Sequence, residues 1–92
     1  MLEKELERYF VRRCKELGLL TYKFVSPANR GVPDRLVIYG GQVTFFELKR
    51  AGKSLTTLQQ HTKKLFEEHG AKVFVVDSKE TIDDLLGYLL WD

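Results

Sequence analysis

Two acidic residues and a lysine are spaced along this chain so that a β-hairpin would bring them together. Asp34 and Glu47 are thirteen positions apart, and Lys49 follows two positions after Glu47. Gly40-Gly41, which lies between the acids and is flanked by apolar β-formers, is typical of a two-residue hairpin turn. Such a turn would place Asp34 directly opposite Glu47, with Cβ atoms roughly 5 Å apart.

This arrangement predicts a metal site. Two carboxylates that face each other repel unless a cation lies between them. Lys49 points to the same face as Glu47, because side chains alternate along a strand. A divalent ion held by Asp34, Glu47 and the carbonyl of Leu48 would suit the hydrolysis of an anionic ester, and a phosphodiester fits best. The alternative is a plain Glu47–Lys49 salt bridge without a metal.

The elements that would position these residues follow from periodicity and turn signals. Strands are predicted over residues 19–25, 35–39, 43–49 and 72–76. Helices are predicted over residues 2–17, over 57–69, and from Asp77 or Ser78 to about residue 90. The order is αβββαβα, and the crossover between the last two strands should make them parallel. We therefore expect one α/β domain over residues 1–92, a mixed sheet flanked by helices.

Helical spacing also predicts which side chains are buried. The second helix should turn four side chains inward: Leu58, Thr62, Leu65 and Phe66. Cys14 lies in an apolar-periodic segment and is expected to be a buried small hydrophobe. The last helix should bury leucines 85, 86 and 89, which leaves Tyr88 and Trp91 on another side. That aromatic pair would form an interface between two copies or cover the domain's own edge.

Composition narrows the class of protein. The single cysteine excludes an internal disulfide framework and a Cys-rich zinc site. No apolar run approaches the length of a membrane span, and the chain is charged from Glu3 onward, unlike a signal peptide. We expect a soluble, cytoplasmic protein with no membrane partner.

The net charge of +2 conceals an asymmetry. Residues 77–92 hold five acids against Lys79 alone, a net charge of −4, so the remainder of the chain carries +6. Four of the basic residues bracket the acids and are expected to contact a phosphate backbone: Arg30, Arg35, Arg50 and Lys53. The alternative is an ordinary solvated surface.

These motifs resemble those of a known family. Gly31-Val32-Pro33-Asp34, Glu47-Leu48-Lys49 and then Gln59 resemble the PD-(D/E)XK nucleases, and more closely their VRR-NUC branch, the virus-type replication–repair nucleases. The likeness covers nearly the whole chain, including the leading helix and Gly70-Ala71-Lys72-Val73. It implies a restriction-endonuclease-like core and an Mg²⁺- or Mn²⁺-dependent deoxyribonuclease.

The resemblance also implies roles for single residues. Asp34 and Glu47 would be metal ligands, Lys49 the catalytic lysine and Gln59 an accessory residue of the active site. The family places a glutamate of the first helix at the site, where Glu7 fits best and Glu3, one helical turn earlier, is the alternative. Gln59 has a second role open to it, since Thr56-x-x-Gln59 is a helix capping box.

The substrate expected from the resemblance is branched DNA. Small stand-alone members are associated with four-way (Holliday) junctions, as in DNA repair, and larger ones with flaps. Cutting a junction symmetrically needs two active sites, which favours a homodimer. The alternatives are a flap-type or non-specific nuclease, a non-catalytic DNA-binding module and a structural subunit. The expected setting is the cytoplasm of a bacterium or a phage-infected host.

Overall fold

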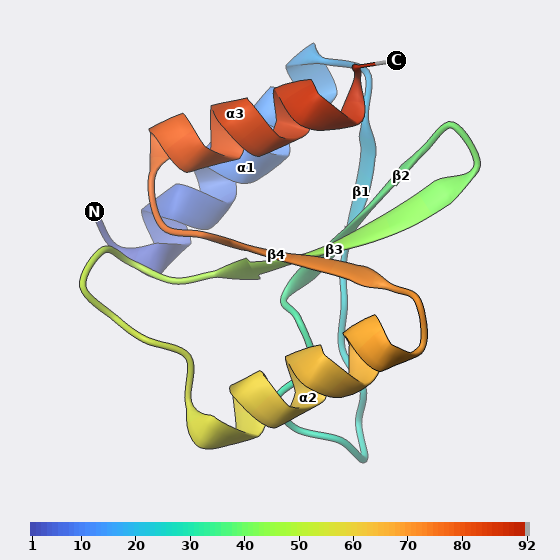
Figure 1. Ribbon diagram of the computed structural model, residues 1–92. Helices are drawn as coiled ribbons and strands as arrows, with labels where there is room; N and C mark the ends of the chain where they lie inside the picture. The colour runs from blue at the N-terminus through green and yellow to red at the C-terminus, as the bar shows by residue number, and fades with distance from the viewer. Residues whose placement is uncertain (92) are drawn as a thin grey trace.

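Figure 1 shows the computed structural model, in which residues 1–91 are described. The elements follow in the order α1 (Glu3–Glu16), β1 (Leu20–Lys23), β2 (Arg35–Tyr39), β3 (Gln42–Leu48), α2 (Thr57–Glu68), β4 (Lys72–Val76) and α3 (Lys79–Leu89). This confirms the predicted αβββαβα order, with bounds that differ by one or two residues at most ends. Among residues 1–91, no helix has both the length and the apolar character needed to span a bilayer.

The four strands form one mixed sheet in the order β1-β2-β3-β4. β1, β2 and β3 pair antiparallel, whereas β3 and β4 pair parallel across the α2 crossover, as predicted. Gly40 and Gly41 both have positive φ angles, 60° and 78°, which a two-residue hairpin turn of type I′ requires. The turn sets the predicted register, with Tyr39 opposite Gln42 and Leu36 opposite Phe45.

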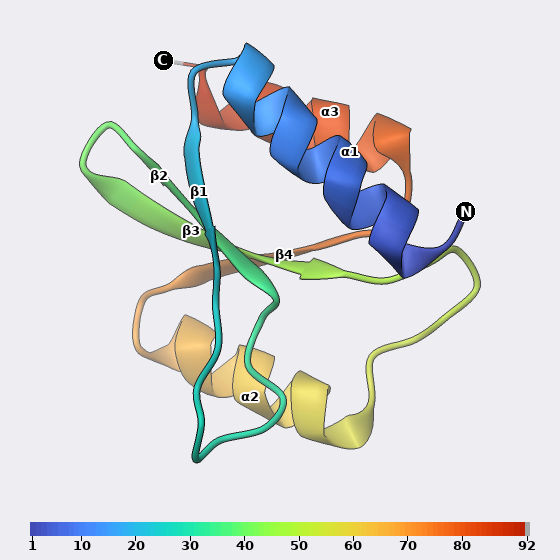
Figure 2. The same cartoon turned by 180° about the vertical axis from the view of Figure 1, so that it is seen from behind.

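Helices cover both faces of the sheet. α1 and α3 lie side by side on one face, and α2 lies on the other, as the two opposite views agree (Figures 1 and 2). The main core fills the space under α1 and α3, where Phe10 of α1 stacks on Phe46 of β3 with ring centroids 4.9 Å apart. Cys14 is buried in this core, as expected, and burial raises the pKa of its thiol to about 11.

A smaller aromatic cluster lies on the α2 face. Phe24, Phe45 and Phe66 have ring centroids 5.0–6.3 Å apart and join the segment after β1 to β3 and α2. Because side chains alternate along β3, Phe45 faces α2 while Phe46 faces α1. The prediction that Leu58 and Leu65 point inward is wrong, since 48% and 41% of their surfaces are exposed.

Gly31 is the point at which the loop before β2 lies against α2. A Cβ built at this position would lie 2.9 Å from Cγ of Leu58 and 3.0 Å from Oγ1 of Thr62. Its φ of +83° is also one that only glycine adopts easily. Close backbone contact here fixes the path of the chain into Pro33 and Asp34, just before β2 begins.

This contact predicts an unequal pair of glycine substitutions. Gly31→Ala should lower the free energy of unfolding by roughly 1–3 kcal/mol more than Gly70→Ala, because overpacking adds to the backbone strain. Gly70 is a matched control, with a φ of +89° and nothing within 4 Å of its built Cβ. Urea denaturation followed by circular dichroism measures both variants. Equal losses would show that α2 yields to the added methyl group.

Candidate active site

Asp34 is held in place by backbone hydrogen bonds on both sides. Its N–H donates to the carbonyl of Phe46 at 3.0 Å, and its carbonyl accepts from the N–H of Phe24 at 2.8 Å. The backbone N–H of Leu48 then donates to Oδ2 of the Asp34 side chain at 2.8 Å. The carboxylate is therefore oriented toward the end of β3.

Glu47 comes to the same place from β3. It is only 4% exposed, and alternation along the strand turns it toward α2, on the same side as Phe45. Gln59, near the start of α2, donates a hydrogen bond of 3.1 Å from Nε2 to Oε1 of Glu47. Asp34 and Glu47 thus lie together where β2 begins and β3 ends, as the hairpin register predicted.

Both carboxyl groups have raised pKa values. Burial raises the pKa of Asp34, although the hydrogen bond from the Leu48 amide opposes the change. Burial, and then the charge of Asp34, raise the pKa of Glu47 to about 8, while the positive charge of Lys49 works in the opposite direction. Without a further cation, the pair therefore retains a proton at neutral pH.

Lys49 is close enough to influence Glu47 but is not tied to it. The residue directly follows β3, is half-buried, and donates its backbone N–H to the carbonyl of Val76 at 2.9 Å. No ion pair joins Glu47 and Lys49 in the part of the chain that the structure describes. The salt bridge considered as an alternative is therefore absent, and the ammonium group of Lys49 is available to a ligand.

Gln59 takes both of the roles that the sequence left open. Its Oε1 accepts a hydrogen bond of 3.0 Å from the N–H of Thr56, and its own N–H donates to the Thr56 hydroxyl, so the capping box is complete. The Nε2 group remains free to hold Glu47. One side chain thus joins the start of α2 to the buried acid.

The structure corrects the expectations for Arg35 and Glu7. Arg35 is only 8% exposed, and its guanidinium group contacts the Glu7 carboxylate at 3.0 Å and the Thr21 hydroxyl at 3.2 Å. A buried, paired arginine cannot reach DNA, so the expected nucleic-acid contact by Arg35 is wrong. The same pair turns Glu7 toward the α1 face of the sheet, away from Glu47.

Glu3 fits the position of the first-helix glutamate better than Glu7. Its charge raises the pKa of both Asp34 and Glu47, whereas that of Glu7 is a cause only for Asp34. Glu3 is exposed at the first position of α1, and the start of this helix lies beside the end of β3 (Figures 1 and 2). The ranking of Glu7 above Glu3 is therefore reversed.

The other predicted contacts lie on the surface. Arg30, Arg50 and Lys53 are all exposed. Arg50 and Lys53 belong to the turn after β3, which borders the start of α1. Sequence reasoning missed the Leu48 amide as a partner of Asp34, since any residue supplies a backbone N–H and none leaves a signal for it.

The donor set suits a hard divalent cation. No group of three or more His, Cys, Asp or Glu side chains within residues 1–91 is placed to hold a metal ion, so the protein offers Asp34, Glu47 and backbone carbonyl oxygen. Mg²⁺ is commonly bound in this way, by one or two carboxylates while it keeps several waters. Zinc would favour three or four protein ligands with nitrogen or sulfur donors. The residues present therefore fit Mg²⁺ or Mn²⁺.

The raised pKa of Glu47 predicts a pH-dependent stability without metal. Between the ordinary value of 4.5 and about 8, the folded chain holds a proton that the unfolded chain has lost. Stability in EDTA should therefore fall as pH rises through this range, by at least ~1 kcal/mol, or about 4–8 °C in Tm. Glu47→Gln should flatten this dependence in thermal melts at pH 5 and pH 8.

Glu80→Gln, which changes an exposed glutamate of α3, is the matched control and should keep the wild-type slope. If Glu47→Gln melts with the same pH dependence as Glu80→Gln, burial does not shift the pKa of Glu47 as described.

Comparison with known proteins gives the family. No protein-family model matches the sequence. A curated relative, "Putative nuclease p44" of Acyrthosiphon pisum secondary endosymbiont phage 1, is 38% identical over 79 residues, covering 85% of this chain and 85% of the relative. A solved structure described as a "VRR_NUC domain" matches with a TM-score of 0.85 and 32% identity, over 92% of this chain and 94% of that chain. The chain belongs to the VRR-NUC family of nucleases.

Proposed function

We propose that this chain is a metal-dependent DNA endonuclease whose active site is built on Asp34, Glu47 and Lys49. The observation that carries the proposal is the pair of neighbouring carboxyl groups with raised pKa values, beside a lysine that does not neutralise them. A structural subunit would have no use for two acids in this arrangement, because their proximity destabilises the fold.

Asp34, Glu47 and the carbonyl of Leu48 would hold Mg²⁺ or Mn²⁺. When bound, such an ion lowers the pKa of water and offsets negative charge on the phosphoryl group. The protein's share is to keep the two carboxylates fixed, through the Leu48 amide on Asp34 and Gln59 on Glu47. Glu3 is positioned to add a carboxylate at the edge of the site.

Lys49 would act on the attacking water or on the phosphate. An ammonium group beside the acids can orient the water, take its proton, or stabilise charge that develops on the phosphate oxygens. Arg30, Arg50 and Lys53 are exposed cations that would hold the phosphates flanking the cut.

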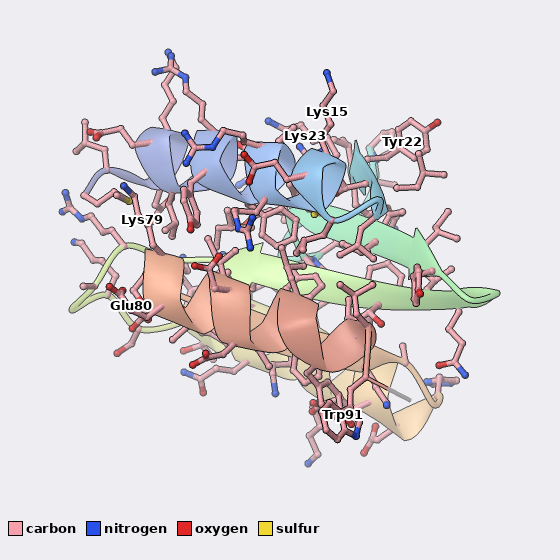
Figure 3. All side chains as sticks on the ribbon, turned by 90° about the horizontal axis from the view of Figure 1, so that it is seen from above. Lys15, Tyr22, Lys23, Lys79, Glu80 and Trp91 are labelled. Atoms are coloured by element: carbon pink, nitrogen blue, oxygen red, sulfur yellow. The ribbon has the colours of Figure 1, made fainter. Side chains whose placement is uncertain are left out.

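Branched DNA cut by a homodimer is the preferred substrate and assembly. Symmetric cutting of a four-way junction needs two active sites related by a two-fold axis. Tyr88 and Trp91 supply a candidate interface, since 54% and 82% of their surfaces are exposed. Figure 3 shows Trp91 on the side of α3 away from α1, clear of the main core. The setting would be the cytoplasm of a bacterial or phage-infected cell.

Cleavage assays test the active site. Asp34→Ala and Lys49→Ala should each slow the cutting of labelled four-way junctions in Mg²⁺ or Mn²⁺ by about 10²–10⁴-fold. Asp84→Ala and Lys64→Ala remove the same charges from exposed positions on α3 and α2 and should cut like the wild type. Equal rates in all variants would contradict the proposed site.

Flap and linear duplex substrates, run in parallel, test the substrate. If only flaps are cut, junction resolution is wrong while nuclease activity stands.

A second set of variants separates the two roles of Gln59. Thr56→Ala removes the hydroxyl cap and should cost about 1 kcal/mol of stability, with cleavage retained, because Gln59 can still reach Glu47. Gln59→Ala loses the cap and also the Glu47 contact, so its cleavage rate should fall as well. Ser78→Ala breaks the other capping box, on α3, and serves as a stability control. Cleavage lost equally in Thr56→Ala and Gln59→Ala would mean that the cap alone matters.

A further inference from the structure

The outer face of α1 carries a row of four basic side chains. Lys4, Arg8, Arg12 and Lys15 are spaced by three or four residues, so they lie on one side of the helix, and all four are exposed. We call this row the α1 stripe. Figure 3 shows Lys15 extending from α1 away from the body of the domain. None of these residues was part of the basic rim predicted from the sequence.

Most of this charge is not neutralised by neighbouring acids. Among residues 1–91, Lys4, Arg8 and Lys15 form no ion pair, and Arg12 has only a long contact of 3.9 Å with Glu16. Glu7, which borders the same groove, is already paired with Arg35. The remaining acid nearby, Glu5, lies on the flank of α1 that borders Lys79. The stripe therefore presents a strong positive field to solvent.

The stripe is continuous with the candidate active site. Lys4 follows Glu3, whose charge reaches both Asp34 and Glu47, and the start of α1 lies beside the end of β3 (Figures 1 and 2). Arg35, the neighbour of Asp34 in sequence, lines the groove beneath the stripe. From Lys4 to Lys15 the helix rises about 16 Å, which is about half a turn of duplex DNA.

We propose that the α1 stripe binds the phosphate backbone of a DNA arm that extends away from the cut position. The inference rests on the proposed nuclease function and adds a second contact surface to it. Duplex DNA carries one charge per about 1.7 Å of its axis, so a row of cations of this length can face several phosphates at once. Such contacts are independent of base sequence, which suits recognition by shape.

An anionic lipid surface is the other polyanion that a basic helix can meet. Helices that bind membranes insert an apolar face, but the apolar face of α1 is already used in the core, where Leu6, Phe10 and Cys14 are at most 1% exposed. Charge complementarity without an apolar face therefore favours DNA.

The test compares two double variants with the same change in net charge. Arg8→Gln/Lys15→Gln alters the stripe, and Lys64→Gln/Lys72→Gln alters exposed lysines on α2 and β4. Binding to a fluorescent 30-base-pair duplex is measured by anisotropy in EDTA, between 50 and 200 mM salt. Each lost phosphate contact lowers the salt slope by about 0.9, so wild-type affinity should fall about tenfold more over this range than that of the stripe variant. The control should keep the wild-type slope.

Duplex length provides a readout that misfolding would not mimic. The wild type and the control should bind a 30-base-pair duplex more tightly than a 10-base-pair duplex by a larger factor than the stripe variant does. In Mg²⁺, the stripe variant should raise the KM for cleavage more than it lowers kcat.

The outcomes separate this inference from the proposed function. If the wild type cuts DNA but both double variants show its salt slope and length dependence, the stripe does not bind DNA and the nuclease assignment stands. If the wild type neither binds nor cuts DNA, both proposals fail. Stripe-dependent binding to vesicles containing anionic phospholipid, with unchanged DNA binding, would also overturn the inference.

Discussion

Two carboxyl groups held side by side, largely away from water, are the constraint on which the arrangement of this domain depends. Burial and mutual repulsion raise the pKa of both Asp34 and Glu47, so the fold retains a destabilising pair at one end of its sheet. Such a pair persists only where the surrounding structure leaves the side chains no other position. In a nuclease, a cation and a phosphate would relieve the conflict, so binding and stability are linked at the same two residues.

Each neighbouring element contributes to holding this pair. The Gly40-Gly41 turn fixes the register of β2 and β3, and the Leu48 amide and Gln59 each fix one carboxyl group. Gly31 brings the preceding loop against α2, the helix that also carries Gln59. The position of α2 therefore affects both acids, and substitutions in the loop before β2 will be felt at the site.

The features that could be predicted from the sequence are those set by local rules. Turn chemistry at Gly40-Gly41 gave the register, and apolar periodicity gave the order of helices and strands. The prediction for Arg35 failed, because a basic residue beside an acid motif looks the same whether it faces solvent or a helix packed above it. The choice of Glu7 over Glu3 failed for a related reason, since it depended on where the start of α1 lies relative to β3.

Packing information also explains what the sequence could not reveal about α1. Its basic residues are interleaved with acids along the chain, and only the positions of Glu7 and Arg35 show that one face keeps its positive charge. Leu58 and Leu65 gave a misleading signal in the same way, because α2 meets the loop before β2 as well as the sheet.

Isothermal titration calorimetry with Mg²⁺ and Mn²⁺ near pH 7 tests the central claim most directly. If Asp34 and Glu47 form a metal site that retains a proton when empty, binding should release that proton, and the measured heat should vary with the ionisation enthalpy of the buffer. Asp34→Asn and Glu47→Gln should abolish the binding, and Asp84→Asn should leave it unchanged. Absence of binding in the wild type, or binding that survives both carboxylate substitutions, would contradict the account.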